Sequence, residues 1–128
     1  MRLKFRIEDY IRTDGYDPAY TFGYFLEQYL QLTQRKKKEF AHDIQIHETL
    51  LSQILNDRRE PTESIFIRLE LHSGNTISAI NWLKLAEKKK KHQIKTDHSL
   101  RERERQYVNN RLSISCRDWG AGLSYGRS

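Results

Sequence analysis

Two short stretches with regularly spaced apolar residues follow one another between residues 40 and 62. Side chains three or four positions apart share one face of a helix, so each run predicts a short amphipathic helix. Two such helices joined by a tight turn bury their shared side chains and leave the outer face of the second helix free, as in a helix-turn-helix. We expect the buried side chains between the two helices to form an apolar wedge. Its residues are Phe40, Ala41, Ile44, Ile46, Leu51 and Ile54.

Three further segments carry the helical period, and together with the central pair they predict an all-α fold of five helices. The first begins at Thr21, whose side chain is suited to an N-cap. The next follows Pro61, with Thr62 at the cap position, and ends before Gly74. The last begins at Thr76 or Ser78 and runs into a lysine-rich stretch.

The length of 128 residues suits one domain with appendages. Hydrophobic residues make up 37% and charged residues 31%, so part of the chain is expected to lie outside any core. We assign 1–20 to an N-terminal extension, 21–87 to the helix-turn-helix domain, and 88–128 to a basic C-terminal helix and tail that is partly flexible.

The formal net charge of +6 favours phosphate-bearing partners, nucleic acid first, over acidic substrates. A single cysteine, Cys116, excludes an internal disulfide and indicates a reducing compartment. The acidic Glu8 and Asp9 interrupt any secretory signal, and no apolar run approaches the roughly 18 residues that cross a bilayer. We therefore expect a soluble, cytoplasmic protein without membrane contact.

The sequence gives no indication of an enzyme. Hydrolase, P-loop and dinucleotide-binding motifs are all missing, so we expect neither catalytic residues nor a cofactor. The histidines lack the spacing of a metal site and are better explained as scattered surface residues. They are His42, His47, His72, His92 and His98.

The stretch "EFAHDIQIHETLLSQILNDRREPT", followed by "IRLELHSGNTISAINWLKL", resembles the lambda-repressor-like, or Xre-type, helix-turn-helix family. Within that family it is most similar to the HigA and VapI-type antitoxins of toxin–antitoxin modules. The resemblance to the wider family runs from about Phe22 to Leu85, half the chain, and implies a five-helix lambda-repressor-like domain. Two positions depart from the family pattern, because Gln45 and Asp57 stand where glycine is common. The matching positions are Leu51 to Leu55, Asn56, Arg59, Pro61, Thr62, Arg68 to Glu70, Trp82 and Leu83.

The resemblance also implies which residues contact DNA. Residues at the start of the second helix of the pair, and one turn further on, would face base edges in the major groove, where Gln53 pairs with adenine and Thr49 contacts thymine. The expected base contacts are His47, Glu48, Thr49 and Gln53; the expected phosphate contacts are Lys36, Lys37, Lys38, Asn56, Arg58, Arg59 and Thr62. The alternative for both sets is an ordinary solvated face, and His47 alone has the further alternative of a helix cap.

The function implied is an antitoxin that represses its own operon and neutralises a small basic ribonuclease toxin by direct binding. The alternatives are a stand-alone Xre-type regulator and a scaffold that no longer touches DNA. A homodimer is expected because useful discrimination takes two half-sites. For its surface we consider Ile80, Trp82 and Leu83, although Trp82 more often completes a core. For the toxin we favour the aromatic residues of the extension (Tyr10, Tyr16, Tyr20 and Phe22) over the tail from Tyr107 to Trp119. The run from Lys88 to Lys91 is expected chiefly to keep the chain soluble, with phosphate contact or an acidic partner as alternatives.

Overall fold

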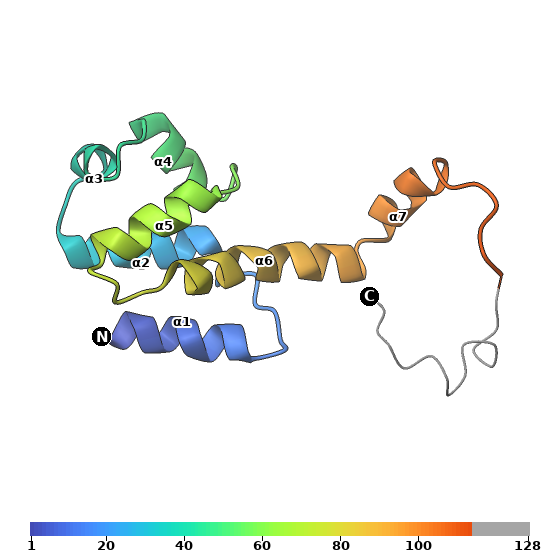
Figure 1. The fold of residues 1–128 in the computed structure, drawn as a ribbon, viewed down its shortest axis with the longest axis horizontal. Coiled ribbons are helices and arrows are strands. Elements are labelled where there is room, and N and C mark those ends of the chain that lie inside the picture. The colour runs from blue at the N-terminus through green and yellow to red at the C-terminus, as the bar shows by residue number, and fades with distance from the viewer. Residues whose placement is uncertain (114–128) are drawn as a thin grey trace. The chain divides into compact units, whose positions relative to one another are not determined.

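The computed structural model describes residues 1–113, which form helices and connecting loops without a strand (Figure 1). The predicted all-α class is therefore confirmed for this part of the chain. None of its helices is long and apolar enough to span a membrane. The helices are α1 (Arg2–Arg12), α2 (Phe22–Thr33), α3 (Lys37–Asp43), α4 (Glu48–Leu55), α5 (Glu63–His72), α6 (Ala79–Thr96) and α7 (His98–Arg105).

The chain divides after Thr96 into two compact units. The first contains α1 to α6 and one continuous hydrophobic core. The second begins at Asp97, whose carboxylate accepts a hydrogen bond from the Ser99 backbone N–H and so caps α7. Ion pairs such as Arg105 with Glu102 run along α7, which buries none of its residues.

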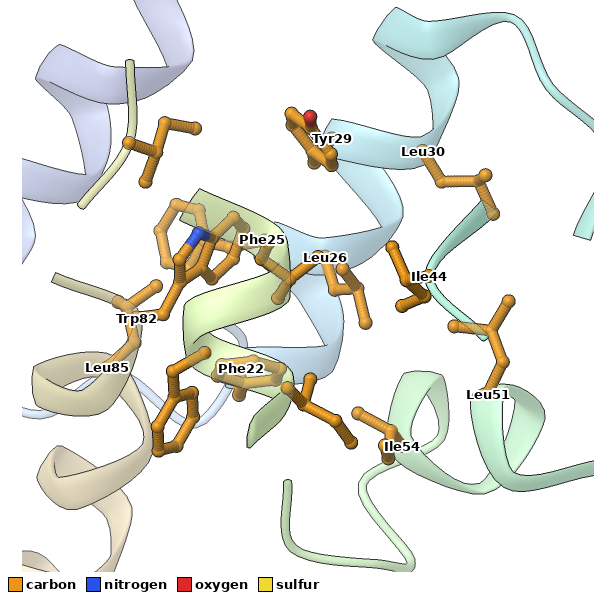
Figure 2. Close-up of a cluster of buried hydrophobic side chains, with 14 of the residues drawn as sticks. Phe22, Phe25, Leu26, Tyr29, Leu30, Ile44, Leu51, Ile54, Trp82 and Leu85 are labelled. Atoms are coloured by element: carbon orange, nitrogen blue, oxygen red, sulfur yellow. The ribbon is translucent and has the colours of Figure 1, made fainter. Parts of the chain in front are cut away.

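Helix α2 is the centre of the first unit. Its N-terminus is capped as predicted, because the Thr21 hydroxyl accepts a hydrogen bond from the Tyr24 backbone N–H at 3.0 Å. Its buried side chains lie between those of α4 on one side and those of α6 on the other (Figure 2). The buried side chains of α2 are Phe22, Phe25, Leu26, Tyr29 and Leu30.

Residues 1–20, predicted as an N-terminal extension, include α1, which packs against α2 and α6 and contributes to the core. Leu3 and Ile7 are four positions apart on one helical face, and both are buried. The Arg6 guanidinium also donates a 2.7 Å hydrogen bond to the Tyr24 hydroxyl. The four-residue spacing of Leu3 and Ile7 indicates a helix, although none was predicted for residues 1–20.

Helix α6 starts where the sequence predicts and ends later. The Ser78 hydroxyl accepts from the Asn81 N–H at 3.1 Å, and the Glu70 carboxylate accepts from the Ala79 N–H at 2.8 Å. These two contacts satisfy N–H groups that a helix start otherwise leaves unpaired. The helix then continues through the lysine run to Thr96, because glycine and proline are absent from that stretch.

Candidate nucleic-acid interface

The predicted helix pair is present as α3 and α4, which pack against each other. Ala41, at 2% exposure, provides the small residue at the crossing. Phe40 and Leu51 are completely buried, and Ile46 is half-buried against the same cluster. The wedge expected from the sequence therefore forms, and it fixes which edge of α4 faces outward.

The turn between α3 and α4 is built without glycine. Gln45 adopts a left-handed conformation, with φ of 57°. Its N–H donates to the His42 carbonyl at 3.1 Å, and the Ile46 N–H donates to the Ala41 carbonyl at 2.9 Å, which is the Schellman pattern of helix ends. The Gln45 side-chain amide donates to the His42 carbonyl as well. Glutamine therefore occupies a position where glycine would avoid steric cost.

Arg68 of α5 also holds this turn. One guanidinium nitrogen, Nη1, donates to the Ile44 and Gln45 carbonyls at 3.0 and 3.1 Å. Hydrogen bonds from a charged donor are stronger than those between neutral groups, so α5 fixes the turn. In the sequence, Arg68 was noted only as a position that matches the family pattern. The structure shows that its side chain holds the turn in place.

Helix α4 approaches α2 closely at Gly23. A Cβ atom at this position would lie 2.3 Å from the Leu55 carbonyl oxygen, so only glycine fits there. Beside it, Asp57 adopts φ of 58° and points its carboxylate at the start of α2. One carboxylate oxygen accepts from the Gly23 N–H at 2.9 Å, and the other accepts from the Thr21 hydroxyl at 2.6 Å. Asp57 therefore locks the end of α4 to α2 in a way that glycine cannot.

The C-terminal end of α3 is held in place by a polar network. The Arg35 guanidinium makes two hydrogen bonds to the Asp43 carboxylate, at 2.9 and 3.0 Å, and this pairing lowers the pKa of Asp43. His72 of α5 lies 4.0 Å from the same carboxylate and 2.6 Å from the Tyr29 hydroxyl. Burial raises the pKa of Tyr29 to about 12. The network joins α3 to α2 and α5.

The four candidate base-contacting residues all reach the surface of α4. His47, Glu48 and Thr49 are exposed, and Gln53, one helical turn beyond Thr49, is half-buried. His47 occupies the N-cap position but makes no side-chain capping hydrogen bond, so the cap alternative is not supported. Glu48 has a second explanation, because an acidic side chain in the first turn is favoured by the helix dipole.

The candidate phosphate-contacting residues flank this surface at two places. Arg58 and Arg59 follow α4 directly and are exposed, as are the nearby Asn56 and Thr62. The lysines 36–38 are exposed at the start of α3, about 10 Å along the helix from the turn, at 1.5 Å per residue. Cations are disfavoured at a helix N-terminus. The Glu39 carboxylate counters this by accepting from the Lys36 N–H at 2.9 Å.

Several residues considered as contacts for protein partners pack against other residues of the same chain. Trp82 is fully buried and packs its ring against Phe22, so Trp82 forms no external surface and Phe22 keeps only a 6% exposed edge. Tyr10 lies beneath the Lys88 ammonium at 3.9 Å from its ring centre, and Tyr16 stacks on a histidine of α6 at 4.2 Å. Of the dimer candidates, Ile80 is 56% exposed and Leu83 is partly buried. The tail candidate reaches Trp119, which lies outside the described residues.

No cluster of three or more potential metal ligands occurs within residues 1–113. Comparisons of the chain with protein-family models, with curated proteins and with solved structures gave no match.

Proposed function

We propose that this chain is a sequence-specific, double-stranded-DNA-binding protein of the lambda-repressor-like class, which inserts the outer edge of α4 into the major groove. One observation carries the proposal. On α4, Leu51 and Ile54 are buried, whereas Thr49 and Gln53, one turn apart, are not. A helix of this kind, anchored from behind and polar in front, is how a helix-turn-helix presents side chains to base edges.

The anchoring supports readout as well as binding. Base recognition depends on holding a few side chains in fixed positions. Helix α4 is fixed at its start by Arg68 on the turn and at its end by Asp57 on α2. These contacts come from two other helices, so α4 has little freedom to slide or rotate.

The flanking cations suit the phosphate backbone on either side of the groove. Lys36 to Lys38, Arg58 and Arg59 would supply five charged contacts per subunit, with neutral hydrogen bonds from Asn56 and Thr62. Each neutralised phosphate contributes a slope of about −0.9 to log K against log salt, so binding by one subunit should fall with a slope of roughly −4 to −5. A homodimer on two half-sites would double it.

The direct test begins by selecting duplexes that bind the full chain from a random-sequence library. Affinity for the selected site and for a scrambled duplex is then measured by fluorescence anisotropy. Gln53→Ala should weaken binding to the selected site about tenfold and binding to the scrambled duplex much less, because a good base pairing is worth about 1–3 kcal/mol. Lys37→Ala should weaken both alike. Lys4→Ala, on α1, is the control and should change neither.

Failure of the selection to enrich any sequence, together with absence of salt-dependent binding, would favour a scaffold that no longer touches DNA. Equal losses for Gln53→Ala and Lys37→Ala on both duplexes would mean that a different side of α4 faces the groove. Either result rejects the proposed mode of recognition.

Within this class we propose an antitoxin that represses its own operon and sequesters a small basic ribonuclease. Its support is the resemblance of residues 39–85 to HigA and VapI-type antitoxins. Co-purification of the chain with the product of the neighbouring reading frame tests this role. A stable complex that inhibits ribonuclease activity supports it, whereas DNA binding without such a partner supports a stand-alone regulator.

A further inference from the structure

A groove of about 450 Å³ lies between the loop that follows α4 and one side of α6. We call it the loop–α6 groove and define it by Arg58 and Arg59 of the loop, by Lys89 of α6, and by the apolar residues Phe22, Phe66 and Leu83. Its volume falls in the range of about 300–1,000 Å³ that is usual for small-molecule sites.

The loop–α6 groove offers cations from two separate elements. Within residues 1–113, the side chains of Arg58 and Lys89 make no hydrogen bond or ion pair. Arg59 has a single long contact, 3.5 Å to the Gln53 amide oxygen. The positive charge on both walls is therefore available to a ligand.

The carboxylates around the loop–α6 groove do not cancel all of this charge. Asp57 directs both oxygens at the start of α2. Glu60 pairs with Lys90 at 3.2 Å. Glu87 is the one remaining acidic lining residue. The lining residues therefore include four cations, Arg58, Arg59, Lys89 and Lys90, and three carboxylates, Asp57, Glu60 and Glu87, so the groove has a net charge of +1 beside an apolar floor.

We propose that the loop–α6 groove binds a small amphipathic carboxylate. The carboxylate would lie between Arg58 and Lys89, where charge-assisted hydrogen bonds are available from both walls. The hydrocarbon body would cover the edges of Phe22, Phe66 and Leu83, and burial of that apolar surface would supply the remaining affinity.

Such a ligand would also affect DNA binding, and this consequence rests on the proposed function. Arg58 and Arg59 are candidate phosphate contacts, and a carboxylate held by the same guanidinium groups competes with the DNA backbone. Linkage is reciprocal, so DNA would weaken the binding of the carboxylate by the same factor. Binding of an organic acid in the groove would therefore release the protein from its DNA site.

The test uses decanoate, at concentrations below those at which it forms micelles, titrated into the full chain and followed by amide chemical shifts. Shifts should concentrate at Phe66, Leu83 and Lys89. Lys89→Gln should raise the Kd about tenfold, since a hydrogen bond to a charged group is worth about 1.5–3 kcal/mol. Lys91→Gln, on an exposed position of α6 outside the groove, is the matched control and should leave the Kd unchanged.

Two further probes separate the parts of the proposal. Acetate carries the carboxylate without the chain and should bind at least 100-fold more weakly. Decyltrimethylammonium carries the chain with the opposite charge and should not bind in the groove. Equal binding of decanoate and decyltrimethylammonium, or equal effects of Lys89→Gln and Lys91→Gln, would overturn the inference.

Binding of decanoate is measured without DNA, so the two proposals fail separately. Decanoate binding by a chain that shows no affinity for any duplex rejects DNA recognition and retains the carboxylate site. Specific DNA binding by a chain that ignores decanoate rejects the carboxylate site alone. Where both bind, decanoate should weaken DNA binding by the wild type and by Lys91→Gln, and much less by Lys89→Gln.

Discussion

Gln45 and Asp57 share one backbone conformation, and replacing each with glycine should have opposite effects on stability. Both residues have φ near 58° and each follows a helix end, at α3 and α4 respectively. Glycine removes the steric cost of the left-handed region, about 1–2 kcal/mol, but adds about 0.7 kcal/mol of conformational entropy to the unfolded chain. The backbone term therefore favours glycine by a few tenths to about 1 kcal/mol at either position.

The side chains decide the difference. Gln45→Gly loses one exposed hydrogen bond, worth about 0.5 kcal/mol, so this variant should be neutral or slightly more stable. Asp57→Gly loses both contacts to the start of α2 and leaves the N–H of the buried Gly23 without a partner, which costs about 2–3 kcal/mol. Net destabilisation of about 1–2.7 kcal/mol should remain.

Urea unfolding measures this difference. All variants carry Trp119→Phe so that the fluorescence reports on Trp82 in the core. With an m-value near 1 kcal/mol/M for a domain of this size, the midpoint of Asp57→Gly should lie about 2 M below that of Gln45→Gly. Asp57→Asn keeps an acceptor oxygen and should fall between the wild type and Asp57→Gly. Equal midpoints for the two glycine variants would refute the assignment of Asp57 as the link between α4 and α2.

Three other perturbations test the packing around α4 and α1. Gly23→Ala should destabilise the protein by about 2 kcal/mol despite the better helix propensity of alanine, because its Cβ would meet a backbone carbonyl at 2.3 Å. Gly15→Ala is the control: its Cβ has open space, so the same urea assay should show almost no change in stability. Ile7→Ala should lower the free energy of unfolding by about 2–5 kcal/mol, since Ile7 is fully buried. Phe5→Ala, on the exposed side of α1, should change stability little. Similar losses of stability for both variants would place α1 outside the core. Because burial raises the pKa of Tyr29 to about 12, the stability that the neutral phenol confers is complete below pH 10 and is lost as pH rises towards 12. The advantage of the wild type over Tyr29→Phe should therefore shrink by about 1 kcal/mol between pH 8 and pH 11, and a constant difference in urea midpoints would contradict this.

Local sequence patterns were sufficient to predict helices α2 to α5. Their apolar side chains recur at helical spacing, and residues such as Thr21 and Gly74 mark the boundaries. The same rule applied to Leu3 and Ile7 would have found α1, so that omission was a missed periodicity. Within the segment 88–128, for which a basic C-terminal helix and tail is predicted, the structure shows the end of α6 and α7.

Contacts between distant positions were not predictable. Asp57 reads as a residue that tolerates turns, and nothing near it in the sequence indicates that its carboxylate reaches a helix start 34 residues earlier. The roles of Arg68 on the turn and of Glu70 at the start of α6 likewise depend on how α5 is placed. Local patterns give the elements, whereas the polar contacts that orient them depend on the tertiary fold.

Under the proposed function, these polar contacts explain how a short helix would be held firmly enough to recognise a DNA sequence. Helix α4 has eight residues, too few to be stable alone. Its apolar face sets its rotation, Arg68 fixes the turn before it, and Asp57 fixes the loop after it. Loss of Asp57 should therefore free the loop that carries Arg58 and Arg59. The apolar face of α4 would stay packed against the core, so its exposed edge would keep its position. On this reasoning Asp57→Gly weakens binding to selected and scrambled duplexes alike, whereas Arg68→Met, which loosens the turn beside His47, reduces the preference for the selected site.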